Sequence, residues 1–164
     1  MHALGLSEFA LRLPSALAAL LWAGAVYRFG RRYFDANTAA CAVLILLTCA
    51  QVTLVSKAAI ADALLNLFIA SSMFALFGFY DYRKRSYLRL AAAFIALGAL
   101  TKGPIALLVP LLTCTVYCAS YRRWDLLRAS LTDRWAWGVF VAIALPWPLA
   151  AYLDQGNDLL EAWF

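Results

Sequence analysis

The chain has 164 residues, of which 65% are hydrophobic and only 14% are charged. Soluble domains contain about half apolar and a quarter charged residues, so this composition excludes an ordinary soluble domain and indicates a membrane protein. The net charge of +5 does not indicate nucleic-acid binding, because most of the cations lie in short loops between apolar runs.

Six apolar runs follow one another along the sequence. Most have close to the ~20 residues that cross ~30 Å of hydrocarbon as an α-helix, and helices satisfy their own backbone hydrogen bonds in lipid. In chain order, the predicted helices cover about 9–29, 36–55, 58–80, 88–100, 104–118 and 135–152. The sequence therefore predicts an all-α membrane protein in which residues 1–164 form a six-helix transmembrane bundle, part of a larger transmembrane domain.

Three of the predicted loops carry most of the 14 cations. These are alternate loops, so they lie on one side of the membrane, which the positive-inside rule identifies as the cytoplasmic side. The loop cations are Arg28, Arg31, Arg32, Arg83, Lys84, Arg85, Arg89, Arg122, Arg123, Arg128 and Arg134. The basic charge therefore reports the topology of the chain.

The remaining cations, Arg12, Lys57 and Lys102, fall at the opposite ends of the predicted helices. Each is expected near a helix amino terminus, where the macrodipole already places about half a positive charge. Such ends would repel one another unless an anion lies among them, and their free N–H groups suit phosphate. We therefore predict a phosphate or lipid-donor site formed by these three cations and by Gly103. The structural alternative is that each cation only ends a helix or extends to the interface.

The turn that contains Lys102 is expected to lie below the membrane surface. The runs before and after it, 88–100 and 104–118, are shorter than the hydrocarbon layer is thick. Irregular backbone at that depth is tolerated where it lines a cavity or is buried in protein. The prediction is an outward pocket around this turn.

Asp62 is the only acid within the six apolar runs, and Asn66 follows on the same helical face. An intramembrane acid is by default a functional candidate, so Asp62 is predicted to be catalytic. Its structural alternative is a partner for Lys57 or Arg12. An acid beside cations suits transfer of a sugar from a polyprenyl phosphate, which needs a base near the nucleophile and positive charge on the departing phosphate.

Metal chemistry receives little support from the sequence. His2 is the only histidine, and the four cysteines, which lie in apolar runs, are expected to be small core residues. No cofactor is predicted with certainty, and a divalent metal is left open.

Four segments occur in an order and spacing that resemble a known family. They are "FALRLPSALAALLWAGAVYRFGRRYFD", "SKAAIADALLNLF", "LGALTKGPIALLVPLL" and "IALPWPLAAYLDQGNDLLEAWF". Together they resemble the middle of lipid-linked-sugar glycosyltransferases of the large membrane class, GT-C. The similarity is to glycosyltransferase family 39, which includes aminoarabinose transferases and protein O-mannosyltransferases.

The resemblance implies a polyprenyl-phosphate sugar donor, a lipid or protein acceptor and an outward-facing active site in a bacterial inner membrane, on the periplasmic or extracellular face. It implies that Asp62 is the second acid of the catalytic face, that Lys102 is the lysine of the "TKG" turn, and that Arg12 opens its helix. An upstream helix, the first outward loop with the leading candidate base, and a carboxy-terminal part are expected outside this chain. The chain alone is therefore expected to be inactive.

Two other readings of the charged residues stay open. Charges in an outward cavity also mark the substrate path of a transporter or flippase. In a noncatalytic membrane assembly subunit, the same residues would be structural. Neither reading involves nucleic acid, and both keep membrane lipids as partners.

Overall fold

The computed structural model describes residues 8–50, 52 and 62–155, and within these residues the chain is α-helical with no strand. The all-α prediction is confirmed, whereas the count of six helices is not, because eight helices are found in this part of the chain. They are α1 (Glu8–Tyr33), α2 (Ala36–Thr48), α4 (Asp62–Tyr82), α5 (Arg85–Lys102), α6 (Ile105–Ser120), α7 (Trp124–Thr132), α8 (Arg134–Ala144) and α9 (Pro146–Gln155).

The extra helices occur where the hydropathy of the sequence does not mark the start or the end of a helix. The predicted loop between 118 and 135 contains α7, an amphipathic helix of 9 residues. The predicted helix over 135–152 is divided into α8 and α9, since Pro146 begins α9. A proline has no N–H and its ring meets the carbonyl of the residue four positions earlier, so the chain bends there.

The predicted helix over 88–100 was too short. The helix α5 has 18 residues, which corresponds to about 27 Å, because the polar residues at both of its ends are also helical. The predicted helix over 36–55 is interrupted, since α2 ends at Thr48 and the backbone of Cys49 is extended, while residues 51 and 53–55 lie outside the described residues. Of the predicted helix over 58–80, residues 58–61 lie outside the described residues.

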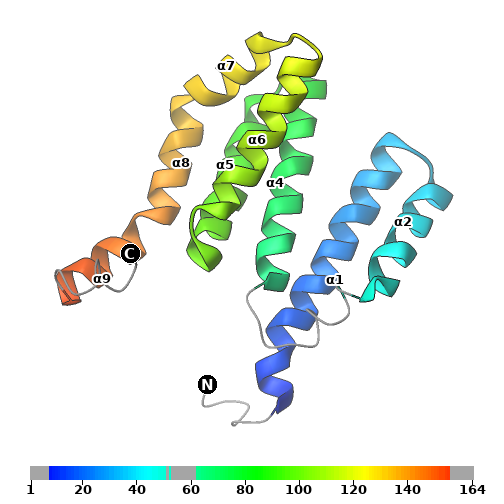
Figure 1. Cartoon of the computed structure of the whole chain (residues 1–164), viewed down its shortest axis with the longest axis horizontal. Coiled ribbons are helices and arrows are strands. Elements are labelled where there is room, and N and C mark those ends of the chain that lie inside the picture. The colour runs from blue at the N-terminus through cyan, green and yellow to red at the C-terminus, as the bar shows by residue number, and fades with distance from the viewer. Residues whose placement is uncertain (1–7, 51, 53–61, 156–164) are drawn as a thin grey trace.

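The helix α4 lies at the centre of the arrangement (Figure 1). It packs against α1 on one side and against α5 and α6 on the other, while α8 packs on α5 and α2 packs on α1. The largest buried cluster is rich in small side chains from α4, α5 and α6, which allow close helix approach. Its members are Ala75, Leu76, Phe79, Tyr80, Leu88, Ala91, Cys114, Cys118, Leu126 and Ala136.

Because successive long helices run antiparallel, the chain has two ends that differ in charge (Figure 1). All the predicted loop cations lie at or near the upper end, where α1, α4 and α6 finish; we call this the basic end. The lower end holds the start of α4, the finish of α5 and the start of α6; we call it the Asp62 end. The alternation predicted from the loop charges is therefore present in the fold.

One described helix, α4, is long and apolar enough to cross a membrane, with 21 residues. The helices α2, α6 and α8 are apolar but shorter. Many large apolar side chains are exposed along these helices, among them Leu44, Ile45 and Leu112, as expected where helices face lipid or further helices.

Candidate functional site

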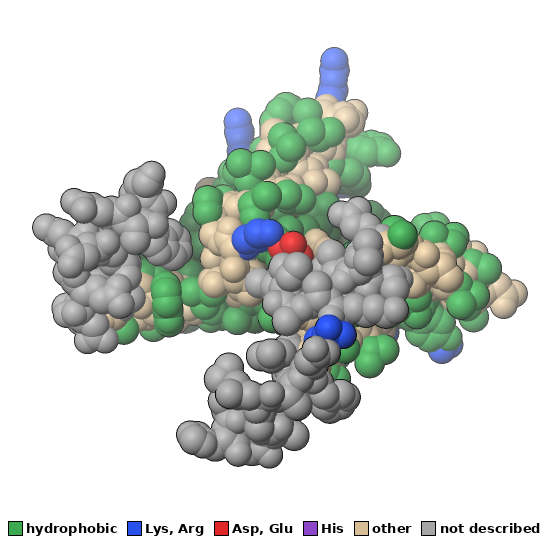
Figure 2. All heavy atoms as spheres, turned by 60° about the horizontal axis from the view of Figure 1, so that its bottom comes forward, with side chains coloured by type: hydrophobic (Ala, Val, Ile, Leu, Met, Phe, Trp, Pro, Cys, Tyr) green, Lys and Arg blue, Asp and Glu red, His purple; other side chains and the backbone are tan. Residues whose placement is uncertain are grey.

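Asp62 and Lys102 form an ion pair at the Asp62 end. Asp62 is the first residue of α4, and Lys102 is the last residue of α5. The antiparallel packing of these helices brings the two residues together, so that Nζ of Lys102 donates a hydrogen bond to Oδ1 of Asp62. Figure 2, which turns this end toward the reader, shows basic and acidic side chains touching among hydrophobic ones.

The pair is accessible rather than buried. The side chains of Asp62 and Lys102 keep 31% and 54% of their surface exposed. The next residue of α4, Ala63, is buried in a small cluster with Ala18 of α1. The charged atoms therefore lie on top of a packed helix junction, where a ligand can reach them.

Each member of the pair also suits the dipole of its own helix. An acid is favoured at an amino terminus and a cation at a carboxyl terminus. Lys102 was expected just before the amino terminus of the next helix, and it does lie two residues before Pro104, which caps α6. It is also the last residue of α5, because that helix continues through Thr101 and Lys102 before Gly103 ends it.

Gly103 ends α5 in a backbone conformation that favours glycine. Its φ is 73° and its ψ is −147°, in the region that side chains with a Cβ rarely adopt. Its N–H donates to the carbonyl of Ala99 at 2.8 Å, while Oγ1 of Thr101 donates to the carbonyl of Gly98 at 2.6 Å. These bonds fix the turn in which Lys102 lies, which gives Gly103 a positioning role in addition to its predicted place at a donor site.

Gly98 brings the start of α6 against α5. A Cβ added at Gly98 would lie 2.8 Å from Cβ of Ala106 and 3.5 Å from Cβ of Phe68. The three helices α4, α5 and α6 therefore meet closely, one turn before Lys102. This contact sets the height of the "TKGP" turn relative to Asp62.

Of the other two predicted donor-site cations, Arg12 lies within the described residues and Lys57 does not. Arg12 is exposed and lies on α1, six residues before Ala18, and therefore toward the same end of the molecule. As expected, it lies near a helix amino terminus, about one turn after Glu8, where α1 begins, although Pro14 is inside the helix and not in its first turn. Asn66, one turn after Asp62, is partly exposed.

Metal-ligating side chains do not gather in threes anywhere in the described residues. The prediction that all four cysteines are core residues is confirmed for two of them and wrong for the other two. Cys114 and Cys118 are buried, whereas Cys41 and Cys49 are exposed on α2 and at its end, because this helix packs only against α1 within the described chain.

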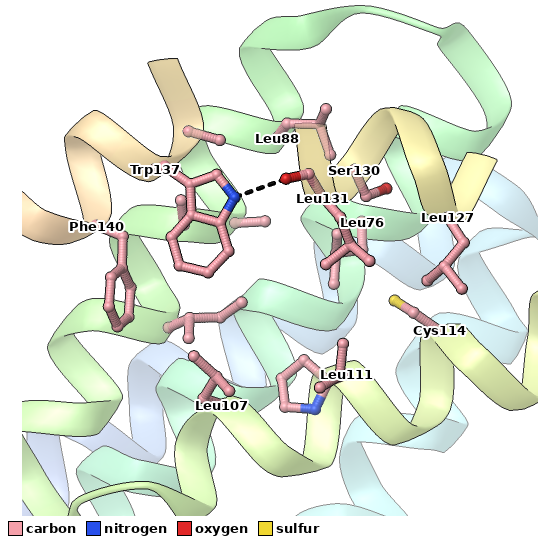
Figure 3. Close-up of a pocket in the computed structure, with 15 residues that line it drawn as sticks. Leu76, Leu88, Leu107, Leu111, Cys114, Leu127, Ser130, Leu131, Trp137 and Phe140 are labelled. Carbon is pink, nitrogen blue, oxygen red and sulfur yellow. Dashed lines mark hydrogen bonds between the residues drawn. The ribbon is translucent and has the colours of Figure 1, made fainter. Parts of the chain in front are cut away.

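A cavity of about 160 Å³ lies elsewhere, between α5, α6, α7 and α8 (Figure 3). Its lining is almost wholly apolar, with Leu107 and Phe140 toward one end and Ser130 toward the other. The indole Nε1 of Trp137 donates to the carbonyl of Leu131 at 2.7 Å and is thereby satisfied. With no charged side chain in its lining, this cavity cannot be the predicted phosphate site.

Sequence reasoning missed a second ion pair, at the basic end. Oδ2 of Asp133 lies 3.6 Å from Nη1 of Arg85. Oδ1 of Asp133 accepts the backbone N–H groups of Trp135 and Ala136, at 3.0 and 3.1 Å, and so caps α8. The signal was present, because an aspartate directly before a helical run is a typical amino-terminal cap.

Comparisons with known proteins place the chain in a family. Residues 1–151 match the family model described as dolichyl-phosphate-mannose-protein mannosyltransferase. A curated relative from Shewanella sediminis, an undecaprenyl phosphate-alpha-4-amino-4-deoxy-L-arabinose arabinosyl transferase, is 28% identical over 160 residues, which are 92% of this chain and 28% of that protein.

The fold has a solved counterpart. The crystal structure of ArnT from Cupriavidus metallidurans bound to undecaprenyl phosphate matches with a TM-score of 0.85 and 25% identity, over 95% of this chain and 30% of that one. The chain thus spans less than a third of the length of these relatives. The resemblance to membrane GT-C glycosyltransferases is confirmed, and the chain belongs to the dolichyl-phosphate-mannose-protein mannosyltransferase family.

Proposed function

We propose that this chain forms part of the active site of a membrane glycosyltransferase. The enzyme takes a sugar from a polyprenyl phosphate and transfers it to a hydroxyl or phosphate acceptor at the face of the membrane where the Asp62 end lies. By the positive-inside rule, that face is periplasmic or extracellular. The observation that carries the proposal is the accessible Asp62–Lys102 pair on a junction held by Gly98 and Gly103.

The membrane location follows from composition, from the apolar helix α4 and from the separation of charge between the two ends. The chemistry follows from the relatives, which are glycosyltransferases by name, and from the undecaprenyl phosphate in the related ArnT structure.

Each member of the pair has a distinct role in this proposal. Lys102 binds the phosphate of the donor and stabilises the negative charge that grows on it as the bond to the sugar breaks. Asp62 accepts the proton of the acceptor as its oxygen attacks the anomeric carbon. The new glycosidic bond forms, the bonding electrons leave with the phosphate oxygen, and the lipid phosphate departs.

The ion pair gives this reaction a resting state. Without donor, Asp62 and Lys102 neutralise each other. The donor is a phosphodiester, which carries one negative charge as a carboxylate does, and its two free oxygens accept hydrogen bonds from the same ammonium group, so in this proposal donor binding draws Lys102 away from Asp62. The carboxylate is then free to accept a proton only when the donor is present, which couples donor binding to activation of the acceptor.

The test uses the full-length protein in membranes with a polyprenyl-phosphate sugar. Asp62→Asn and Lys102→Ala should each lower sugar transfer by about 100-fold or more, as loss of a general base or of a charge contact does. Matched controls remove the same charges at the other ends of the same helices. Asp81→Asn on α4 and Lys84→Ala before α5 should keep transfer within about two-fold of wild type.

Membrane insertion of all four variants is measured alongside transfer. If Asp62→Asn and Lys102→Ala both insert and both keep wild-type transfer, the proposal is wrong. Donor binding separates the two roles, because Lys102→Ala should weaken binding of undecaprenyl phosphate, whereas Asp62→Asn should retain it. Uptake or export of the donor by a variant that transfers no sugar would instead favour a transporter.

A further inference from the structure

A groove of about 270 Å³ lies near the basic end, between α1 and α5. The helix α4 forms its floor through residues such as Phe74 and Gly78. The helices α1 and α5 form the two walls of the groove, and α4 lies between them because it packs against both. The groove is far along the helices from the Asp62–Lys102 pair, since its residues come from the second half of α1 and from 71–78 of α4 and 87–94 of α5.

The polarity of the groove changes along the helix axis. Arg28 and Arg32 line it from the last turns of α1, at the basic end. Phe29 lies between the two arginines along α1 and stacks on Phe74, with ring centroids 4.3 Å apart, and the deeper part is lined by Phe74 and Phe94. Phe94 lies nine residues into α5, which corresponds to about 13 Å from the helix start. The groove therefore has a cationic mouth and an aromatic interior.

The two arginines at the mouth keep their charge available. Nε of Arg32 donates to Oη of Tyr82 at 3.4 Å, and its guanidinium lies over the Tyr82 ring, 4.4 Å from the centroid. These partners are neutral, so they orient the guanidinium without cancelling its charge. In the described part of the chain, the ion pairs involve Arg83, Arg85 and Lys102, and neither Arg28 nor Arg32.

One acid, Asp81, lies close enough to the groove to reduce its positive potential. Asp81, in the last turn of α4, acts electrostatically on Tyr33, which also lines the groove. Asp81 is not itself part of the lining, and the two arginines outnumber it. The mouth is therefore net positive, at the depth where lipid headgroups of the same leaflet lie.

We propose that this groove binds an anionic phospholipid, with its phosphate between Arg28 and Arg32 and one acyl chain along Phe29, Phe74 and Phe94. The site is separate from the donor site, because it lies at the other end of the bundle. A cationic mouth joined to an apolar interior fits an amphiphile with a charged head, and neither a free phosphate nor a neutral lipid satisfies both parts. The bound lipid would hold α1 at its spacing from α5.

The test is lipid binding to the purified full-length protein, measured by native mass spectrometry with phosphatidylglycerol, with phosphatidylethanolamine and with inorganic phosphate. Phosphatidylglycerol should bind at least about ten-fold more tightly than phosphatidylethanolamine, and inorganic phosphate should not displace it. The double variant Arg28→Gln/Arg32→Gln should lose about ten-fold in phosphatidylglycerol affinity. The matched control, Arg122→Gln/Arg123→Gln, removes the same charge at the same end outside the groove and should bind as wild type does.

A second variant tests the apolar part without changing charge. Ala25→Trp places an indole in the groove from α1 and should reduce phosphatidylglycerol binding while the protein stays monodisperse. Equal affinity for the two lipids, an equal loss in the control, displacement by inorganic phosphate, or no bound lipid would each overturn the proposal. The last result would mean that another helix of the full-length protein fills the groove.

Discussion

The helix α5 carries an ion pair at each of its ends, and the two pairs are built differently. At its finish, Lys102 pairs with Asp62; at its start, Arg85 lies beside Asp133. The Asp133 side chain is 1% exposed, and one of its oxygens caps α8 by accepting two backbone N–H groups. The Asp62 side chain is 31% exposed and accepts from a flexible lysine.

This difference separates a structural carboxylate from one suited to chemistry. Moving Asp133 would uncap a helix and leave buried N–H groups without acceptors, so this carboxylate is fixed. Asp62 can exchange Lys102 for another partner at little cost, because exposed ion pairs contribute about 0–1 kcal/mol. A carboxylate in a half-exposed pair is therefore the better candidate for a group that must gain and lose a proton.

The helix dipole adds to the contrast. Lys102 lies at a carboxyl terminus, where a cation is favoured, whereas Arg85 lies at an amino terminus, where it is disfavoured. The negative charge of Asp133, the residue that caps α8, offsets the unfavourable position of Arg85. The Asp133–Arg85 pair therefore joins α5 to α8 and offsets an unfavourable charge, and we expect it to affect stability more than activity.

Removing the charge at each end of α5 should give the largest contrast. Lys102→Met should lower sugar transfer by about 100-fold or more, because the departing phosphate loses its stabilising charge. Arg85→Met should leave transfer within a few-fold and lower the unfolding free energy by about 1 kcal/mol or less, since the arginine is mostly exposed. Transfer kinetics and Tm of the full-length variants measure both effects. An equal loss of transfer in the two variants would refute the division of roles.

The packing beneath the Asp62 end should show the next largest effect. Gly98→Ala places a Cβ where Ala106 already lies, so α5 and α6 must move apart, at a cost of about 1–3 kcal/mol. Adding Ala106→Gly should restore the space and recover part of the loss. The coupling free energy of this double-mutant cycle, obtained from thermal or denaturant unfolding, checks the contact. Additive effects would show that the two positions do not meet.

Truncating the two acids should change stability less than Gly98→Ala does. The substitution at Asp133 should affect stability, and the substitution at Asp62 should affect sugar transfer. Asp133→Ala removes the cap of α8 and should lower stability by about 1–2 kcal/mol, while Asp133→Ser, which keeps a capping oxygen, should lose much less. Asp62→Ala should change stability by less than about 1 kcal/mol and still abolish transfer. A Tm change at Asp62 as large as that at Asp133 would make both pairs structural.

The sequence predicts some of these features and not others, for physical reasons. Apolar runs predicted α1, α4 and α6 well, because the length of a helix in lipid is marked by hydrophobic residues. The helix α7 is amphipathic and therefore produced no apolar run. The ends of α5 are helical but polar, so hydropathy placed them outside the helix.

The site shows the same limit. Asp62 and Lys102 could be singled out because charges near apolar helices are costly and rare. Their pairing could not be predicted, since it depends on the register of α4 against α5, which the close contact of Gly98 with Ala106 helps to set. The sequence offered Lys57 or Arg12 as partners of Asp62 only as the structural alternative to a catalytic role, and the partner in the described residues is Lys102.

The smallest effect should be a pH dependence confined to the basic end. Nη2 of Arg83 donates to Asp125 at 3.0 Å, which holds the pKa of that carboxyl below its usual range. A lowered pKa in the folded state means that the contact stabilises the fold above the unfolded pKa of about 3.9 and is lost as pH falls through the folded value. The protection factors of the α7 amides, that is, their exchange rates relative to the intrinsic rates at the same pH, should therefore fall slightly as the pH drops below about 4. Asp125→Asn should remove this change, whereas Asp62→Asn, at the other end, should leave it intact; the same pH response in Asp125→Asn would assign the effect to another carboxyl.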